Sequence, residues 1–322
     1  MKKFLKVTLI TIGSIVAVIA LVLATTSIVN VVASNSEASA IKPYGERVPV
    51  DGKQMNVAIS GDGDQTVVLI PGFGTSSPTL DFSLLVKELE PTNRVVVVEP
   101  FGYGLSDPTD TERTTANIVR EIHEALQYLQ IDRYVLMGHS IAGIYGLDYV
   151  NQYRDEVTAF VGIDSSVPTQ PNMDTEFPIG AMQTAKSLGL LRLLADMGGD
   201  AYADSGFDEA TKEQMKMFAN KNSMTSTYGD EMAHIGSNFT NSQSLSFPKD
   251  LPILEFIVDP DTVKGWTKLH EEQVASVDHG ELVHLKGDHY LHHTQSKAIA
   301  DTFATFMAEL PQQADAQAQA AQ

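Results

Sequence analysis

Hydrophobic residues form short runs that alternate with longer amphipathic segments over most of the chain. Six runs are almost continuously apolar, which is typical of strands buried on both faces of a parallel sheet. Between two of the runs, Ile118, Ile122, Ala125 and Leu129 recur at the spacing of one helix face. The six predicted strands are residues 66–70, 94–98, 134–137, 159–163, 253–258 and 282–285.

A hairpin precedes these runs, because residues 47–60 alternate in hydrophobicity around Asp51-Gly52. A hairpin followed by alternating strands and helices predicts an α/β fold, with a mostly parallel twisted sheet and helices on both faces. Residues 169–248 interrupt the alternation with helical patterns only, so we expect a helical cap inserted after strand 6. Seven of the eleven methionines lie in it, either as an adaptable apolar surface or as filling for an irregular cap core.

The N-terminus carries Lys2, Lys3 and Lys6 ahead of an uncharged stretch over residues 7–33. A helix needs about 20 apolar residues to span a bilayer, whereas the apolar core of a signal peptide has about 7–15. The length favours a membrane anchor whose positive end stays in the cytoplasm, with the remainder outside. The alternative is a cleaved signal, since Ala38-Ser39-Ala40 resembles a cleavage site.

Beyond the anchor or signal segment, residues 1–33, we expect three parts of the chain. Residues 34–44 are a polar linker, residues 45–310 form the folded domain, and residues 311–322 are a low-complexity, disordered tail. The first 33 residues hold three lysines and no acid, which leaves 19 basic against 41 acidic residues. This negative remainder disfavours nucleic-acid binding. The absence of cysteine excludes disulfides, thiolate nucleophiles and cysteine-ligated metals.

The stretch "YVLMGHSIAGIYG" places Ser140 where a predicted strand meets a helix. The pattern G-x-S-x-A, followed by Gly143, predicts a sharp turn that lifts the serine hydroxyl out of the sheet. A tight packing turn that happens to contain serine would show the same pattern, so the motif needs a base and an acid elsewhere in the chain.

The candidate base is His289, in a loop between the last predicted strand and the last helix. An imidazole exchanges protons near neutral pH, and strand ends are where sheet enzymes collect catalytic groups. His289, His292 and His293 also have a spacing that metal ligands use. No H-E-x-x-H pattern exists and nearby acids are few, so we expect no metal site and no cofactor.

The orienting acid is expected after the strand over residues 253–258, where Asp259 and Asp261 both follow. Asp164, at the end of an earlier strand, is the next candidate. An oxyanion hole needs two backbone N–H groups, and those of Ile141 and Phe73 are the candidates. Phe73 lies between Gly72 and Gly74, which let the backbone approach a substrate.

Five blocks together resemble the α/β-hydrolase superfamily across residues 45–310. They are "PGFG", "EPFGYGLSD", "GHSIAG", "DPDT" and "GDH", in the family's order of nucleophile, acid and base. The blocks are also similar to those of membrane-anchored hydrolases of Gram-positive bacteria. Counting from Pro252 as in that family assigns the acid to Asp261 in preference to Asp259. Pro71, where the family often has histidine, departs from the usual oxyanion loop.

The resemblance implies a serine hydrolase that cleaves carboxylic esters of a small acyl substrate through an acyl-enzyme. A serine at position 140 disfavours the family's dehalogenases and epoxide hydrolases, whose nucleophile is aspartate. Amide or peptide cleavage and acyl transfer on the same triad are alternatives, as is a receptor that binds ligand without turnover.

Overall fold

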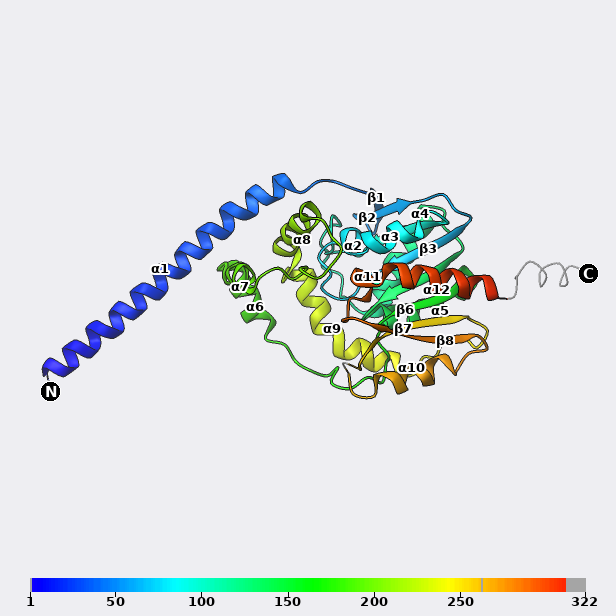
Figure 1. Cartoon of the computed structure of the whole chain (residues 1–322). Helices are drawn as coiled ribbons and strands as arrows, with labels where there is room; N and C mark the ends of the chain where they lie inside the picture. Colours follow the sequence, from blue (N-terminus) through cyan, green and yellow to red (C-terminus); the bar gives the residue numbers. More distant parts are fainter. Residues whose placement is uncertain (1, 262, 311–322) are drawn as a thin grey trace, which may run out of the picture.

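The computed structural model describes residues 2–261 and 263–310, and the predicted disordered tail lies outside them. Eight strands form one sheet in the order β1-β2-β4-β3-β5-β6-β7-β8, antiparallel at β1–β2–β4 and parallel elsewhere (Figure 1). The predicted hairpin and all six predicted strands are confirmed. The strands are β1 (Glu46–Val50), β2 (Lys53–Ser60), β3 (Gln65–Ile70), β4 (Asn93–Glu99), β5 (Tyr134–His139), β6 (Val157–Ile163), β7 (Ile253–Asp259) and β8 (Gly280–Lys286).

The central strands are apolar on both faces because helices cover both faces. Along β3, Val67 and Leu69 enter one core cluster while Val68 and Ile70 enter the other, as the two-residue period of a strand requires. Helices α3, α11 and α12 pack on the first face, and α4 and α5 on the second. The helices outside the cap are α2 (Pro78–Asp81), α3 (Ser83–Leu89), α4 (Thr115–Tyr128), α5 (Ala142–Gln152), α10 (Trp266–Val274), α11 (Leu291–Thr294) and α12 (Ser296–Glu309).

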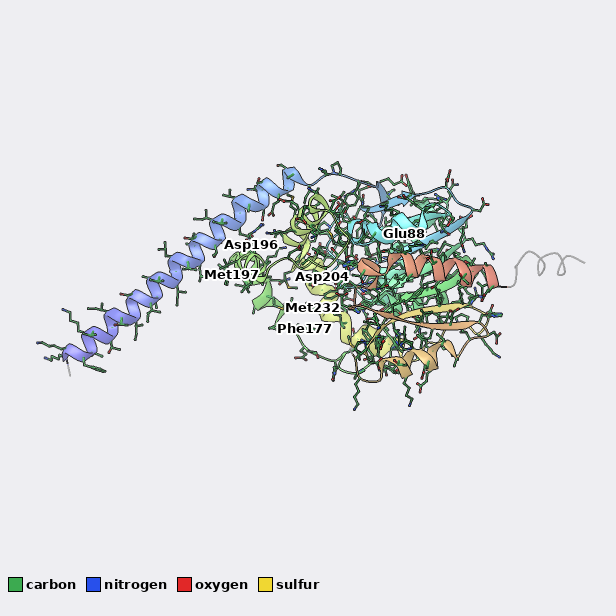
Figure 2. The ribbon with its side chains drawn as sticks, viewed as in Figure 1. Glu88, Phe177, Asp196, Met197, Asp204 and Met232 are labelled. Carbon is green, nitrogen blue, oxygen red and sulfur yellow. The ribbon has the colours of Figure 1, made fainter. Side chains whose placement is uncertain are left out.

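The predicted cap lies between β6 and β7, where the chain forms four helices and no strand. Met215, Met224 and Met232 are buried and fill its core, whereas Met197 is 75% exposed (Figure 2). The four helices are α6 (Ile179–Ser187), α7 (Leu190–Gly198), α8 (Glu209–Asn222) and α9 (Ser226–Ser242).

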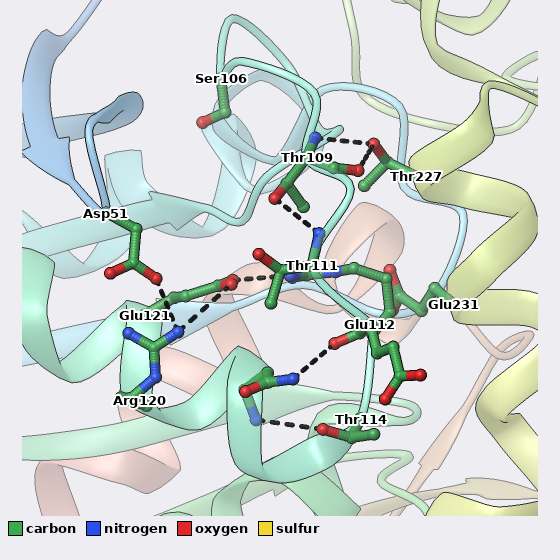
Figure 3. Close-up of polar contacts among 12 residues, drawn as sticks. Asp51, Ser106, Thr109, Thr111, Glu112, Thr114, Arg120, Glu121, Thr227 and Glu231 are labelled. Carbon is green, nitrogen blue, oxygen red and sulfur yellow. Dashed lines mark hydrogen bonds and ion pairs between the residues drawn. The ribbon is translucent and has the colours of Figure 1, made fainter.

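Helix α9 holds the cap to the loop that precedes α4. The Thr227 hydroxyl accepts from the N–H of Thr109 and donates to its carbonyl, both at 2.9 Å (Figure 3). Deeper, the buried Arg113 backbone N–H donates to Asp230 at 2.7 Å, while its guanidinium pairs with buried Glu121 at 2.7 Å. The bonds to Thr227 and Asp230 fix the cap above the C-terminal edge of the sheet, and the pair with Glu121 ties the loop to α4.

The N-terminus is one helix, α1 (Lys2–Ala40), with no buried residue, and it extends away from the domain (Figure 1). Within the described residues it is long and apolar enough to cross a membrane. Helix α1 continues to Ala40 and so includes the first seven residues of the predicted linker over residues 34–44. The Arg192 guanidinium donates to Glu37 at 2.8 Å and to Ser34 at 3.1 Å, which fastens this last part of α1 to the cap.

Candidate active site

Ser140 occupies the turn between β5 and α5 with a positive φ of 55°. Few side chains adopt that region of backbone space, and such strain concentrates at functional sites. The small residues of the motif are required by space. A Cβ on Gly143 would lie 2.3 Å from the Ser166 carbonyl oxygen, and one on Gly138 would lie 2.9 Å from the Ala142 Cβ. The turn therefore has the geometry expected from the sequence.

His289 lies in the loop between β8 and α11, and its Nε2 is 2.8 Å from the Ser140 hydroxyl oxygen. Its side chain is 43% exposed, so one edge of the ring remains open to a substrate. His139, within the same motif as Ser140, donates from Nε2 to the His289 carbonyl oxygen at 2.9 Å. Burial holds the pKa of His139 well below its usual value, so this ring is a neutral support for the loop.

The other ring nitrogen of His289, Nδ1, forms a hydrogen bond with Asp164, at the C-terminal end of β6. The distance from Nδ1 to the carboxylate Oδ2 is 2.5 Å, and the carboxylate is 1% exposed. Its Oδ1 accepts from the indole N–H of Trp266 at 2.7 Å and from the backbone N–H of Val258 at 3.1 Å. Three donors thus satisfy the buried charge, as burial of a carboxylate requires.

The expectation that Asp261 contacts His289 is corrected by this geometry. The exposed Asp261 carboxylate accepts from the hydroxyl and backbone N–H of Thr267, and these bonds lower its pKa. Asp259 is exposed at the end of β7 and is not bonded to His289 either. Strand order gives the reason. Strand β6 neighbours β5, which carries Ser140, whereas β7 is one strand farther away.

The candidate oxyanion donors lie beside the serine. A Cβ on Gly72 would lie 3.0 Å from the Ser140 Cβ, so the loop after β3 packs directly on the turn. Among the described residues, the N–H groups of Phe73 and Ile141 donate to no protein acceptor. The Tyr228 ring of the cap packs 4.7 Å from the Phe73 ring and covers this loop.

A second polar cluster, Asp81 with His292 and His293, adjoins the His289 loop. His292 Nε2 lies 2.7 Å from one Asp81 oxygen and His293 Nε2 lies 2.8 Å from the other. Burial alone would raise the pKa of Asp81, but the two histidines outweigh it and hold that pKa well below its usual range. Sequence analysis missed Asp81, which is 211 residues from His292 in the chain.

The same cluster has the donor atoms of a divalent-metal site, since its three ligand atoms lie within 4.8 Å of one another. His289 is not part of it, because both ring nitrogens of His289 bond to Asp164 and Ser140. The three-histidine grouping considered from the sequence is therefore not formed. Asp81 and His293 instead face a cavity of about 220 Å³ that is also lined by Tyr202 and Tyr290.

A buried acid lies near Asp164. Glu255 on β7 is fully buried, accepts from the Ser165 hydroxyl at 2.9 Å and accepts from the Gln273 amide at 3.0 Å. Burial raises its pKa to about 8. Because Ser165 follows Asp164 directly, Glu255 supports the backbone that carries Asp164.

Comparisons with known proteins agree with this architecture. The family described as alpha/beta hydrolase fold matches residues 65–244, more than half of the chain. The chain belongs to the α/β-hydrolase fold family. Bacillus subtilis YbdG, an uncharacterized protein, is 26% identical over 95% of this chain and 99% of its own length. This relative agrees with the expected similarity to hydrolases of Gram-positive bacteria.

Two further comparisons concern a human relative and a solved structure. Human serine hydrolase BPHL is 30% identical over 39% of the chain and 45% of its own length. The crystal structure of epoxide hydrolase VrEH1 from Vigna radiata superposes with a TM-score of 0.62 at 18% identity, over 82% of this chain and 98% of that chain. At that identity the superposition shows the fold alone.

Proposed function

We propose that this α/β hydrolase is an extracytoplasmic serine hydrolase that cleaves carboxylic esters. The single observation that carries the proposal is the unbroken hydrogen-bonded chain from Ser140 through His289 to Asp164. A nucleophile, a base and an orienting acid in hydrogen-bond contact form the arrangement that activates a serine. The human relative called a serine hydrolase agrees with a serine-based reaction.

Acylation starts when the Ser140 oxygen attacks the ester carbonyl carbon and its proton passes to His289 Nε2. The Asp164 carboxylate holds the proton on Nδ1 and stabilises the imidazolium as it forms. The N–H groups of Phe73 and Ile141 donate to the developing oxyanion. Collapse of the tetrahedral intermediate transfers the proton from His289 to the leaving alcohol and leaves Ser140 acylated.

Deacylation repeats these steps with water as the nucleophile. His289 takes a proton from water, the hydroxide attacks the acyl carbon, and the proton returns to Ser140 as the acid leaves. Several solved structures that share the fold are epoxide hydrolases or haloalkane dehalogenases. The family members that perform those reactions use an aspartate nucleophile, so Ser140 favours acyl chemistry. Amide cleavage and acyl transfer use the same groups and differ in the leaving group or acceptor.

The location outside the cytoplasm rests on α1. Its apolar length and its N-terminal lysines favour a retained anchor with the cytoplasmic end at Lys2. The remainder of the chain then faces outward. Its substrate is a small acyl ester, and α1 attaches the protein to the membrane.

A panel of p-nitrophenyl esters of increasing acyl length tests the proposed reaction. We expect turnover with saturation kinetics in the wild-type protein and none above background in Ser140→Ala. Thermal unfolding of both proteins serves as the control for folding. Equal turnover in a folded Ser140→Ala protein would contradict the mechanism.

A further inference from the structure

We propose that the exposed apolar face of cap helix α7 is seated in the outer leaflet of the membrane that α1 crosses. The inference rests on the proposed anchoring role of α1. The apolar residues of α7 recur at the spacing of one broad helix face, and its exposed members are Leu193, Leu194 and Met197, at 40%, 63% and 75% exposure. Exposed apolar side chains gathered on one helix are costly in water and mark an interaction surface.

The charged residues of α7 are engaged away from this face. Arg192 donates to Asn30, Ser34 and Glu37 of α1, at 3.0, 3.1 and 2.8 Å. Asp196 pairs with Lys216 of α8 at 2.7 Å. The apolar face is left as the free face, and Figure 2 shows Met197 at the edge of the cap near α1.

Contacts between α7 and α1 determine how deep α7 lies in the bilayer. The hydrocarbon core of a bilayer is about 30 Å thick, which is about 20 residues of helix. Counted from Val7, directly after Lys6, that length ends near Thr26. Gly189, directly before α7, packs so closely on α1 that a Cβ there would lie 2.4 Å from the Thr26 carbonyl oxygen. The N-terminus of α7 therefore lies where the hydrocarbon core meets the headgroups.

The polar residues of α1 agree with this depth. Asn30 donates to the Lys186 carbonyl oxygen, and the Ser27 hydroxyl donates to that of Ser187, both at 3.3 Å. The hydrogen bonds of α8 to α1 lie farther out, from Asn220 to Glu37 and from Gln214 to Ala40. The C-terminal end of α6, the turn at Gly189 and helix α7 are the cap segments that reach inward along the anchor. Helices that lie at an interface bury their apolar face in this zone.

Single-cysteine labelling of the full chain tests this seating, since the natural protein has no cysteine. Leu194→Cys and Met197→Cys each carry an environment-sensitive fluorophore in phosphatidylcholine nanodiscs that contain spin-labelled lipid. Tyr128→Cys is the matched control, because Tyr128 is 61% exposed on α4, a helix that lies on the sheet away from the apolar part of α1 (Figure 1). Ile15→Cys reports on α1 itself.

We expect the probes at 194 and 197 to shift to the blue and lose most of their emission to the spin label, and the probe at 128 to keep its emission. If the probe at 15 is quenched while the probes at 194 and 197 behave like the one at 128, the seating of α7 is overturned and the anchor stays intact. An unquenched probe at 15 would overturn both. Ester turnover of each labelled protein is measured separately, so a failure of the proposed reaction is distinguishable from either result.

Discussion

The Nδ1 atom of His289 lies 2.5 Å from a carboxylate oxygen of Asp164, which is 125 residues earlier in the chain. The other carboxylate oxygen accepts from Trp266, the only tryptophan of the protein. The Asp164 carboxylate is thus held from two sides, by the loop that carries His289 and by the helix that follows β7. This position after β6 is the main difference between the site and its sequence-based prediction.

Asp164→Asn should lower kcat by about four orders of magnitude, as in serine proteases where the acid becomes an amide. The Asn oxygen can still accept from Trp266, but its NH₂ group faces His289 Nδ1 and favours the wrong imidazole tautomer. Asp261→Asn should leave kcat near the wild-type value, since among the described residues Asp261 bonds to Thr267 and not to His289. Ester turnover is the readout, with Trp266 fluorescence as the check on folding. A large loss in Asp261→Asn alone would return the acid to that residue.

Glu255 predicts a pH dependence of stability. Its pKa is raised by burial from 4.5 to about 8, so between these values the folded protein keeps a proton that the unfolded chain releases. Ionisation then favours the unfolded state, and stability falls by up to about 1.4 kcal/mol per pH unit as pH rises through this range.

Glu255→Gln removes the titrating group while its amide can still pair with Ser165 and Gln273. Urea unfolding at about pH 5 and about pH 8 should therefore show the variant gaining stability relative to wild type at the higher pH. Parallel pH profiles for the two proteins would mean that Glu255 does not titrate in this range.

Asp81 joins distant parts of the chain through its bonds to His292 and His293, so its removal should destabilise the fold. Asp81→Ala leaves the ring N–H groups of His292 and His293 without their carboxylate acceptor, which should cost about 2–5 kcal/mol. The matched control is Asp301→Ala, which breaks only an exposed pair with Lys297 and should cost less than about 1 kcal/mol. The free energy of urea unfolding measures both. Similar losses in the two variants would contradict the role given to Asp81.

The anchor predicts how the protein fractionates. Because α1 is apolar along residues 7–33, the full chain should remain with membranes after a high-salt wash, and protease added to intact protoplasts should digest the domain. N-terminal sequencing of the mature protein completes the test. A soluble product beginning near Ile41 in the medium would show that the segment is a cleaved signal.

The features of the fold that depend on local sequence patterns could be predicted from the sequence. Buried parallel strands have continuous apolar runs, and the turn at Ser140 needs small neighbours, so the sheet, the turn that carries Ser140 and the loop that carries His289 were predictable. The carboxylate that bonds to His289 was not, because the choice between Asp164 and Asp261 depends on which strand lies beside β5. The Ser- and Asn-containing residues 34–40 resembled a linker, but Arg192 of the cap bonds to Ser34 and Glu37 and supports the helix there.

Covalent labelling by a fluorophosphonate probe tests the central claim most directly, because the reagent reacts with a serine that its own active site activates. Wild-type protein in membranes is treated with the probe, digested, and analysed by mass spectrometry to locate the adduct. The account predicts one adduct on Ser140, weak labelling of Asp164→Asn, and none of folded Ser140→Ala. An unlabelled wild-type protein, or an adduct on another serine that persists in Ser140→Ala, would contradict it.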